Sequence, residues 1–229
     1  MILNDTILKI LSQFNSVTNN VIMSYPITSM RENQNIHVFI DIQKLGSEEF
    51  KEFGIFGLSD FISAVNMIPD FDIELNDKVL EIFNSKSSVK FNTANVSLLE
   101  ETCRGDYELL QRIKKNSTIA EFDISNDDMK SLKQACSVLK NLPFLEIFSE
   151  EDSIVLKVCG LEKSTNSYSL CVDGDKKEDF KIQINTASFK RIPNGNFRFK
   201  IFKSNKGSYI LLLESKDVES LEIIMSVKV

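Results

Sequence analysis

The same order of predicted elements occurs twice along this chain of 229 residues, and this repeat is the strongest constraint on its fold. Apolar residues spaced three and four apart predict a helix over 4–18. Period-two alternation then predicts strands, a shorter helix over 58–68 and further strands. A helix over 125–142 opens the same order again, with four strands, a short helix that carries Lys190 and Arg191, and three more strands. We therefore predict an internal duplication of one β-rich domain.

The helices of the two halves also share their apolar registers. A shift of 122 residues superimposes the two first helices, with the pairs Ile7 and Met129, Ile10 and Leu132, Phe14 and Cys136, and Val17 and Leu139. In the two second helices, Phe61 and Phe189 each precede an Ile-Pro pair. Amphipathic helices share registers by chance, so the duplication rests on the registers and the repeated order together.

A charged segment over 101–117, ETCRGDYELLQRIKKNS, interrupts the strand pattern and is the best candidate for a linker. We predict a first domain over 1–110, a connector over 111–118 and a second domain over 119–229. Because helices are few and short strands are many, the expected fold class is α+β.

The charges are unevenly distributed between the halves. The chain has 27 Lys and Arg against 33 Asp and Glu, a net charge of −6, which argues against a protein that binds nucleic acid over its whole surface. Residues 1–116 hold 11 cations and 16 acids, whereas residues 117–229 hold 16 and 17. The placement of the cations in the second half is therefore more informative than the total.

Cations of the second half follow the predicted helices. Lys130, Lys133 and Lys140 share one helix face, and the adjacent pair Lys190 and Arg191 lies on the short helix. A solvated face is the simpler interpretation of lysines on a single helix. Two neighbouring helices that both present cations would instead form a basic surface, which attracts phosphates without contacting bases. The first half is poorer in helix cations, with Lys9 alone.

Signals for catalysis, cofactors or membrane insertion are missing from the sequence. The single histidine, His37, lies in a strand-like run, and none of the common catalytic or phosphate-binding motifs occurs. The acids over 70–74 and 150–152 are interpreted as solvated side chains, and the four widely spaced cysteines as reduced thiols. No run of about 18 apolar residues and no signal peptide is present. We expect no enzyme, no cofactor, no metal and no membrane contact.

Three segments resemble the DNA sliding clamps, and most specifically the polymerase clamps of T-even-type phages. They are NDTILKILSQFNSVTNNVIM, FGIFGLSDFISAVNMIPDFDIEL and FKIQINTASFKRIPNGNFRFKIF. The resemblance implies a clamp fold of two duplicated domains, each with two helices packed on antiparallel sheets. It also implies a homotrimeric ring around double-stranded DNA, bound without sequence specificity, with helices lining the hole. The implied partners are the phage DNA polymerase, a clamp-loader ATPase and late-transcription factors, in the cytoplasm of the infected bacterial host.

The resemblance further implies three sets of site residues. The DNA-facing set is Lys130, Lys133, Lys140, Lys190 and Arg191, with Lys9 from the first half. The subunit interface pairs an edge strand over 96–100 with one over 167–172, through Val96, Leu98, Leu99, Ser169, Leu170 and Val172. The pocket for a partner peptide comprises Leu109, Leu110, Ile113, Ile223 and Met225.

Alternatives remain open at this point. The five pocket residues would equally well pack the connecting segment onto the core. The chain as a whole could be a non-enzymatic interaction scaffold of duplicated β-rich domains that does not encircle DNA, and a degenerate metal hydrolase is a third, weaker reading. Assembly into a trimer separates the first two functions.

Overall fold

The computed structural model describes residues 2–32, 35–139, 141–160, 166–204 and 207–228. The chain divides into two compact units, Met1–Asp106 and Tyr107–Val229. The segment predicted as a connector, 111–118, belongs to the second unit, where it comprises the end of a helix and the start of a strand.

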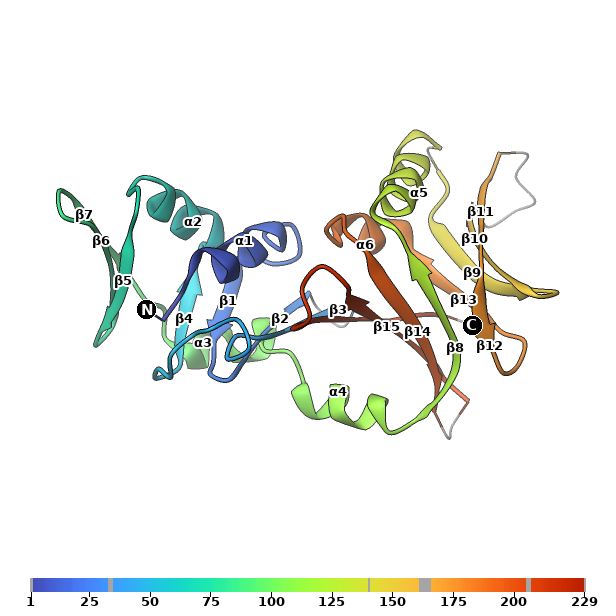
Figure 1. Ribbon diagram of the computed structural model, residues 1–229, viewed down its shortest axis with the longest axis horizontal. Helices are drawn as coiled ribbons and strands as arrows, with labels where there is room; N and C mark the ends of the chain where they lie inside the picture. Colours follow the sequence, from blue (N-terminus) through green and yellow to red (C-terminus); the bar gives the residue numbers. More distant parts are fainter. Residues whose placement is uncertain (1, 33–34, 140, 161–165, 205–206, 229) are drawn as a thin grey trace. The chain divides into compact units, whose positions relative to one another are not determined.

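The first unit consists of two antiparallel sheets and three helices (Figure 1). One sheet has the order β3-β2-β1-β4 and the other β5-β6-β7. The elements are α1 (Asp5–Gln13), β1 (Asn20–Met23), β2 (Ile27–Glu32), β3 (Ile36–Asp41), β4 (Phe53–Phe56), α2 (Leu58–Asn66), β5 (Asp72–Asn76), β6 (Val79–Phe83), β7 (Ser88–Asn92) and α3 (Val96–Cys103).

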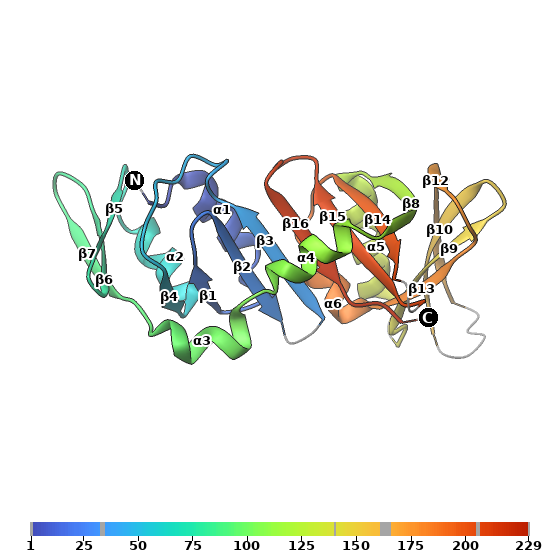
Figure 2. The ribbon, with the colours of Figure 1, turned by 90° about the horizontal axis from the view of Figure 1, so that it is seen from below.

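The second unit repeats this plan with additional strands (Figures 1 and 2). Its sheets have the orders β11-β10-β9-β13 and β12-β8-β14-β15-β16. The elements are α4 (Tyr107–Lys114), β8 (Ser117–Ile124), α5 (Asn126–Val138), β9 (Phe144–Glu150), β10 (Ser153–Cys159), β11 (Tyr168–Val172), β12 (Gly174–Lys176), β13 (Lys181–Asn185), α6 (Thr186–Arg191), β14 (Phe197–Lys203), β15 (Tyr209–Ser215) and β16 (Leu221–Met225).

The predicted duplication is confirmed by the topology. In both units the four strands that follow the first helix are neighbours in the same order, third, second, first and fourth along the chain; only the short β12 interrupts the sequence order in the second unit. In both units the second helix leads into three strands that are neighbours in the other sheet. β7 is therefore the counterpart of β16, and β3 the counterpart of β11.

The helix starts have the caps that the sequence indicates. The Asn4 side chain accepts a hydrogen bond from the Ile7 amide at 3.0 Å. Ser125 and Asp128 form a capping box at the start of α5, in which each side chain accepts a hydrogen bond from the other's backbone amide. These bonds satisfy amides that have no partner within the helix.

Apolar positions that the shared register pairs are mostly buried. Ile7, Ile10, Phe14 and Val17 are at most 4% exposed, and of their counterparts Met129, Leu132 and Cys136 are at most 6% exposed and Leu139 is half-buried. The helix predicted over 4–18 is shorter than expected, because α1 ends at Gln13 with Phe14 as its C-cap. Phe61 and Phe189 of the second helices are both fully buried. The apolar stripe of each helix therefore belongs to the core of its own unit.

The strand predicted over 96–100 is wrong, because this segment is the first part of helix α3. The Asn95 side chain caps the helix by accepting a hydrogen bond from the Ser97 amide at 3.2 Å. Leu99 and Cys103, four residues apart, pack against Ile22 of β1. Close approach to β4 requires glycine at position 54, since a Cβ atom there would lie 2.9 Å from a Leu99 methyl group.

Helices also occupy most of the segment predicted as an irregular linker over 101–117. α3 continues to Cys103 and α4 covers Tyr107–Lys114. The Arg104 guanidinium, between the two helices, forms a two-point ion pair with Glu52, with N–O distances of 3.0 and 2.7 Å. The start of this segment is therefore fixed to the first unit.

Candidate nucleic-acid interface

Helices α5 and α6 of the second unit pack against each other on one side of the sheet β8-β14-β15-β16, and α4 lies on the opposite side (Figures 1 and 2). α5 presents Lys130 to solvent, with 54% of the side chain exposed. The Lys130 ammonium forms an ion pair with Asp127 at 3.1 Å, and Asp127 is itself 89% exposed. Because the pair is solvated, it leaves the Lys130 ammonium accessible to a phosphate.

α6 places two further cations at its C-terminal end. The Asn185 side chain caps the helix by accepting a hydrogen bond from the Ala187 amide at 2.8 Å, and the Thr186 hydroxyl donates to the Leu142 carbonyl at 3.1 Å. Phe189 anchors the helix in the core, and both Lys190 and Arg191 are exposed. Cations at this end of a helix are favoured by the helix dipole.

Lys190 also lies close to α5. Burial raises the pKa of the Cys136 thiol on α5 to about 11, and the positive charge of Lys190 opposes this rise. Lys190 of α6 therefore lies near Cys136 of α5, and we refer to the exposed cations of these two packed helices, Lys130, Lys190 and Arg191, as the basic patch. Such a patch attracts anions through its charge and has no defined pattern of hydrogen-bond donors and acceptors, so it suits phosphates better than base edges.

Lys133, predicted to be an exposed DNA contact, is half-buried. Its ammonium donates to the Ile192 carbonyl and, at 2.9 Å, to Oδ1 of Asn194. Burial lowers the pKa of Lys133 to about 8. The expectation of an exposed side chain is wrong, because the loop that follows α6 provides acceptors that draw the ammonium inward.

The remaining predicted cations differ in their surroundings. Lys140 lies outside the described residues. Lys9 is exposed on α1, which packs against α2. Those two helices also carry Asp5 and Asp60, so the helix pair of the first unit has one cation against two acids.

The residues predicted to form a peptide pocket are mostly in the core. Leu110, Ile113, Ile223 and Met225 are at most 1% exposed, and Leu109 is half-buried. Lys114 at the end of α4 forms an ion pair with Glu222 of β16, which holds α4 on the sheet. Four of the five side chains therefore have no free surface to offer a peptide, which favours the alternative that they pack the connecting segment onto the core.

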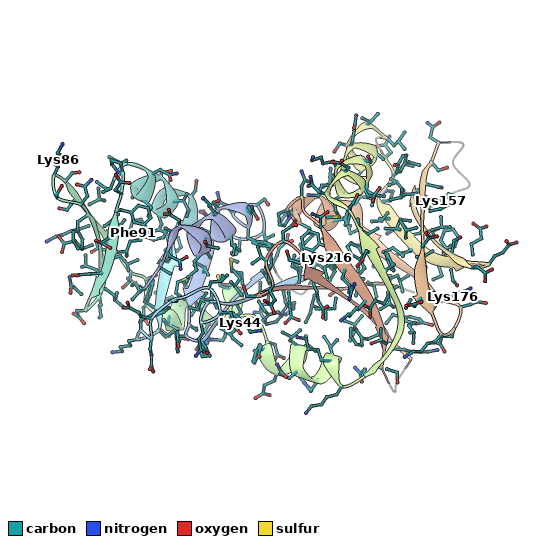
Figure 3. The ribbon with its side chains drawn as sticks, viewed as in Figure 1. Lys44, Lys86, Phe91, Lys157, Lys176 and Lys216 are labelled. Carbon is teal, nitrogen blue, oxygen red and sulfur yellow. The ribbon has the colours of Figure 1, made fainter. Side chains whose placement is uncertain are left out.

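One of the two predicted edge strands is present. β11 lies at the edge of its sheet, with Ser169 exposed and Leu170 and Val172 half-buried. In the first unit β7 is an edge strand of its sheet, whereas the segment that includes Val96, Leu98 and Leu99 is helical. β7 is the second strand of the hairpin whose turn carries Lys86 (Figure 3). The sequence predicted β7 as a strand, and its edge position could have been found from the repeated order of elements.

The described part of the chain shows no group of side chains arranged for catalysis. His37 on β3 is 8% exposed and lies parallel to the Phe39 ring, with 6.5 Å between ring centroids. Burial, together with the positive charge of Arg31, lowers the pKa of His37 below 6.5. Within the described residues, no three acids, histidines or cysteines are close enough together to hold a metal.

All four cysteines are free thiols, two of them buried. None of the helices that the structure describes has both the length and the apolar character that crossing a bilayer requires.

Known proteins similar to this chain were found by sequence and by structure. No protein-family model matches it. Over 207 residues it is 21% identical to the sliding clamp of Vibrio phage KVP40, an alignment that covers 90% of this chain and 85% of the phage protein.

Solved structures of similar fold are PCNA proteins. The PCNA of Thermococcus kodakaraensis superimposes with a TM-score of 0.68 at 9% identity, over 97% of this chain and 96% of that one. The PCNA of A. fulgidus, solved with the C-terminal region of FEN-1 bound, superimposes with a TM-score of 0.65 at 10% identity, over 97% and 94%. The chain therefore has the α+β fold of the DNA clamps, and over nine tenths of its length its sequence is similar to that of a phage sliding clamp.

Proposed function

We propose that this protein is a sliding clamp, of which three copies close into a ring around double-stranded DNA and tether the phage DNA polymerase during replication. The observation that carries the proposal is the basic patch on α5 and α6 of a chain that has the clamp fold and a net charge of −6. In a protein with an excess of acid, cations gathered on one helix pair favour a polyanion at that position.

The basic patch suits a protein that moves along DNA. Lys130, Lys190 and Arg191 bind phosphates through charge, and phosphates repeat along the duplex whatever its sequence. Three copies of the chain would provide three such patches around the hole. Base-specific contacts would instead trap the ring at particular sequences.

Ring closure is proposed to pair β7 of one copy with β11 of the next. Both strands are at sheet edges and each carries half-buried apolar side chains: Val89 and Phe91 on β7, and Tyr168, Leu170 and Val172 on β11. Phe91 contacts Phe61 of α2 at a centroid distance of 5.3 Å. Pairing these edges would continue the sheets from copy to copy, complete the burial of these side chains and cover the open edges of β7 and β11.

Partners are proposed to bind through short segments, as the C-terminal region of FEN-1 is bound to the A. fulgidus PCNA. The phage polymerase is the principal partner, and a clamp-loader ATPase and late-transcription factors are further ones, all in the cytoplasm of the infected host. Among the pocket residues expected from sequence, only the half-buried Leu109 has surface available for such a segment.

The experiment measures assembly and DNA binding together. Sedimentation velocity should find a species of three chains, and fluorescence anisotropy should give duplex affinity that is independent of sequence and falls steeply with salt. Lys190→Glu with Arg191→Glu should abolish binding and leave the trimer intact. Arg112→Glu with Lys115→Glu is the matched control, because it reverses two exposed charges at the end of α4, on the opposite side of the sheet from α5 and α6 (Figures 1 and 2).

The result that refutes the clamp is a strict monomer at all concentrations. Equal losses of DNA binding in the α6 variant and in the control variant would remove the basic patch from the interface. A trimer with no measurable DNA affinity would instead favour the interaction scaffold.

A further inference from the structure

The turn after α6 is attached to α5 at two places. Toward its start, the Lys133 ammonium donates to the Ile192 carbonyl and, at 2.9 Å, to Oδ1 of Asn194. At its end, the Asn126 amide donates to Oδ1 of Asn196 at 3.0 Å. The turn therefore connects the middle of α5 and its first residue to the end of α6.

Asn196 is held from a second side by Asp217. The Asn196 backbone amide donates to one carboxylate oxygen of Asp217 and its side-chain amide to the other, both at 2.8 Å. The preceding residue, Gly195, is buried, and a Cβ atom at that position would lie 3.0 Å from the Asp217 carboxylate. The far end of the turn is thus fixed independently of Lys133, and Lys133 holds the end nearest to α6.

α6 needs such an external bond. It has six residues, and a helix this short is not stable by itself in water. Ile192 is its C-cap, and its carbonyl follows the last helical residue, Arg191. A helix leaves its final carbonyls without partners inside the helix, so the Lys133 ammonium provides a partner one residue beyond Arg191.

Lys133 is poorly placed to bind a phosphate itself. Its ammonium has three N–H groups, of which two are engaged by the turn. Burial lowers the pKa of the group, because the ammonium has lost part of its solvent. The side chain therefore lies along the protein surface with its ammonium directed to backbone and amide oxygens.

We propose that Lys133 is a positioning residue, which holds the end of α6 so that Lys190 and Arg191 stay beside Lys130, and that it does not contact DNA. This inference rests on the proposed function. The bonds to the turn also explain why Lys133 is half-buried, whereas Lys130, which the helical spacing puts on the same face, is exposed.

The test is a double-mutant cycle read by fluorescence anisotropy on a labelled duplex at several salt concentrations. Lys133→Met should weaken binding, and Asn194→Ala, which changes no charge, should weaken it in the same direction. In a Lys190→Gln, Arg191→Gln background, Lys133→Met should have no further effect. Lys133→Arg keeps donors at this position and should restore binding.

The salt dependence gives the expected size. Log affinity falls with log salt, and each lost phosphate contact makes this slope less steep by about 0.9. Displacing both α6 cations should therefore reduce the steepness of the slope by about 2 in each subunit. Circular dichroism melting of every variant separates this effect from unfolding.

Two outcomes overturn the inference. If Lys133→Met and the α6 pair weaken binding additively while Asn194→Ala is silent, Lys133 contacts phosphate directly. If Lys133→Met lowers the melting temperature and leaves DNA affinity unchanged, the bridge serves stability alone. If the α6 pair itself has no effect on binding, the proposed function of the basic patch fails, whatever Lys133 does.

Discussion

Proline at position 169 should open the proposed ring and leave the subunit folded. In an antiparallel sheet, alternate residues direct both backbone groups to the same neighbouring strand. The Ser149 amide donates to the Phe180 carbonyl at 3.1 Å and the Thr186 amide to the Pro143 carbonyl at 2.9 Å, so the odd-numbered residues of β9 bond toward β13. The even-numbered residues of β9 therefore bond toward β10.

The same alternation continues through the sheet to β11. β10 residues that are not bonded to β9 are Ile154, Leu156 and Val158, and they are paired with Val172, Leu170 and Tyr168. Those three β11 residues bond inward, so Ser169 and Cys171 direct their N–H and C=O groups to the open edge. Proline at 169 removes an outward donor, whereas proline at 170 breaks the bonds between β10 and β11.

The expected loss of assembly is large. Leaving one interface carbonyl without its donor costs about 1–3 kcal/mol, and three interfaces give about 3–9 kcal/mol for each ring. At about 1.4 kcal/mol for each tenfold change, the trimerisation constant should fall by about two to six orders of magnitude.

Sedimentation velocity over a concentration series measures this change, and circular dichroism checks the fold. Ser169→Ala keeps the amide and is the matched control, which should assemble normally. Leu170→Pro should lose stability as well as assembly. A Ser169→Pro protein that is folded and trimeric at the same concentrations as the control would refute the pairing through β11.

Four further predictions concern other parts of the chain. Lys90→Pro should dissociate the trimer from the β7 side, because the Thr93 amide bonds to the Lys78 carbonyl and this alternation directs Lys90 outward; Lys90→Ala is the control in sedimentation. Leu110→Ala should lower the free energy of unfolding by about 2–5 kcal/mol in urea denaturation, since Leu110 is fully buried. The pKa of His37 is lowered in the folded state, so stability should fall as pH drops below about 6.5, and His37→Gln should remove that part of the pH dependence in thermal melts. Lys9→Glu should weaken duplex binding less than Lys190→Glu in the anisotropy titration.

Local patterns predicted the regular elements of the fold well. α5 has a polar capping sequence at Ser125, apolar positions at helical spacing and a proline at 143, and each of these signals is local to the segment. Repetition of the pattern in α1 strengthened both assignments. The repeated order indicated that the two units share one topology, because equivalent segments pack in equivalent ways, but it did not give the strand order of the sheets.

The segment 96–103 could not be assigned from local patterns. Val96 and Leu98 fit a strand, whereas Val96, Leu99 and Cys103 fit a helix, and eight residues do not separate the two periods. α3 approaches β4 where Leu99 meets Gly54, whose missing side chain leaves room for the leucine. The two residues are far apart in sequence, and Gly54 alone reads as a weak position in a strand.

For the cations of α5 and α6, too, the sequence predicted what depends on neighbouring residues and missed what depends on residues far along the chain. Helical spacing put Lys130 and Lys133 on one exposed face, and of the two only Lys130 is exposed; the adjacent pair Lys190 and Arg191 is exposed as expected. The environment of Lys133 depends on Ile192, 59 residues further along the chain. A periodic pattern gives the direction of a side chain from its helix, and it does not give the acceptors that another loop brings there.

The two units share a topology and differ in the charge of their helix pairs, and this difference has a consequence for sliding. α1 and α2 carry one cation against two acids, whereas α5 and α6 carry four cations against two acids. A ring of three copies would thus present three basic helix pairs and three that are slightly acidic. Fewer phosphates would be neutralised at once than in a uniformly basic hole, so fewer counterions would be released and the affinity for duplex would be lower. Weaker attachment at each position would lower the barrier to the next one, and topological closure of the proposed ring would then retain the DNA without tight binding.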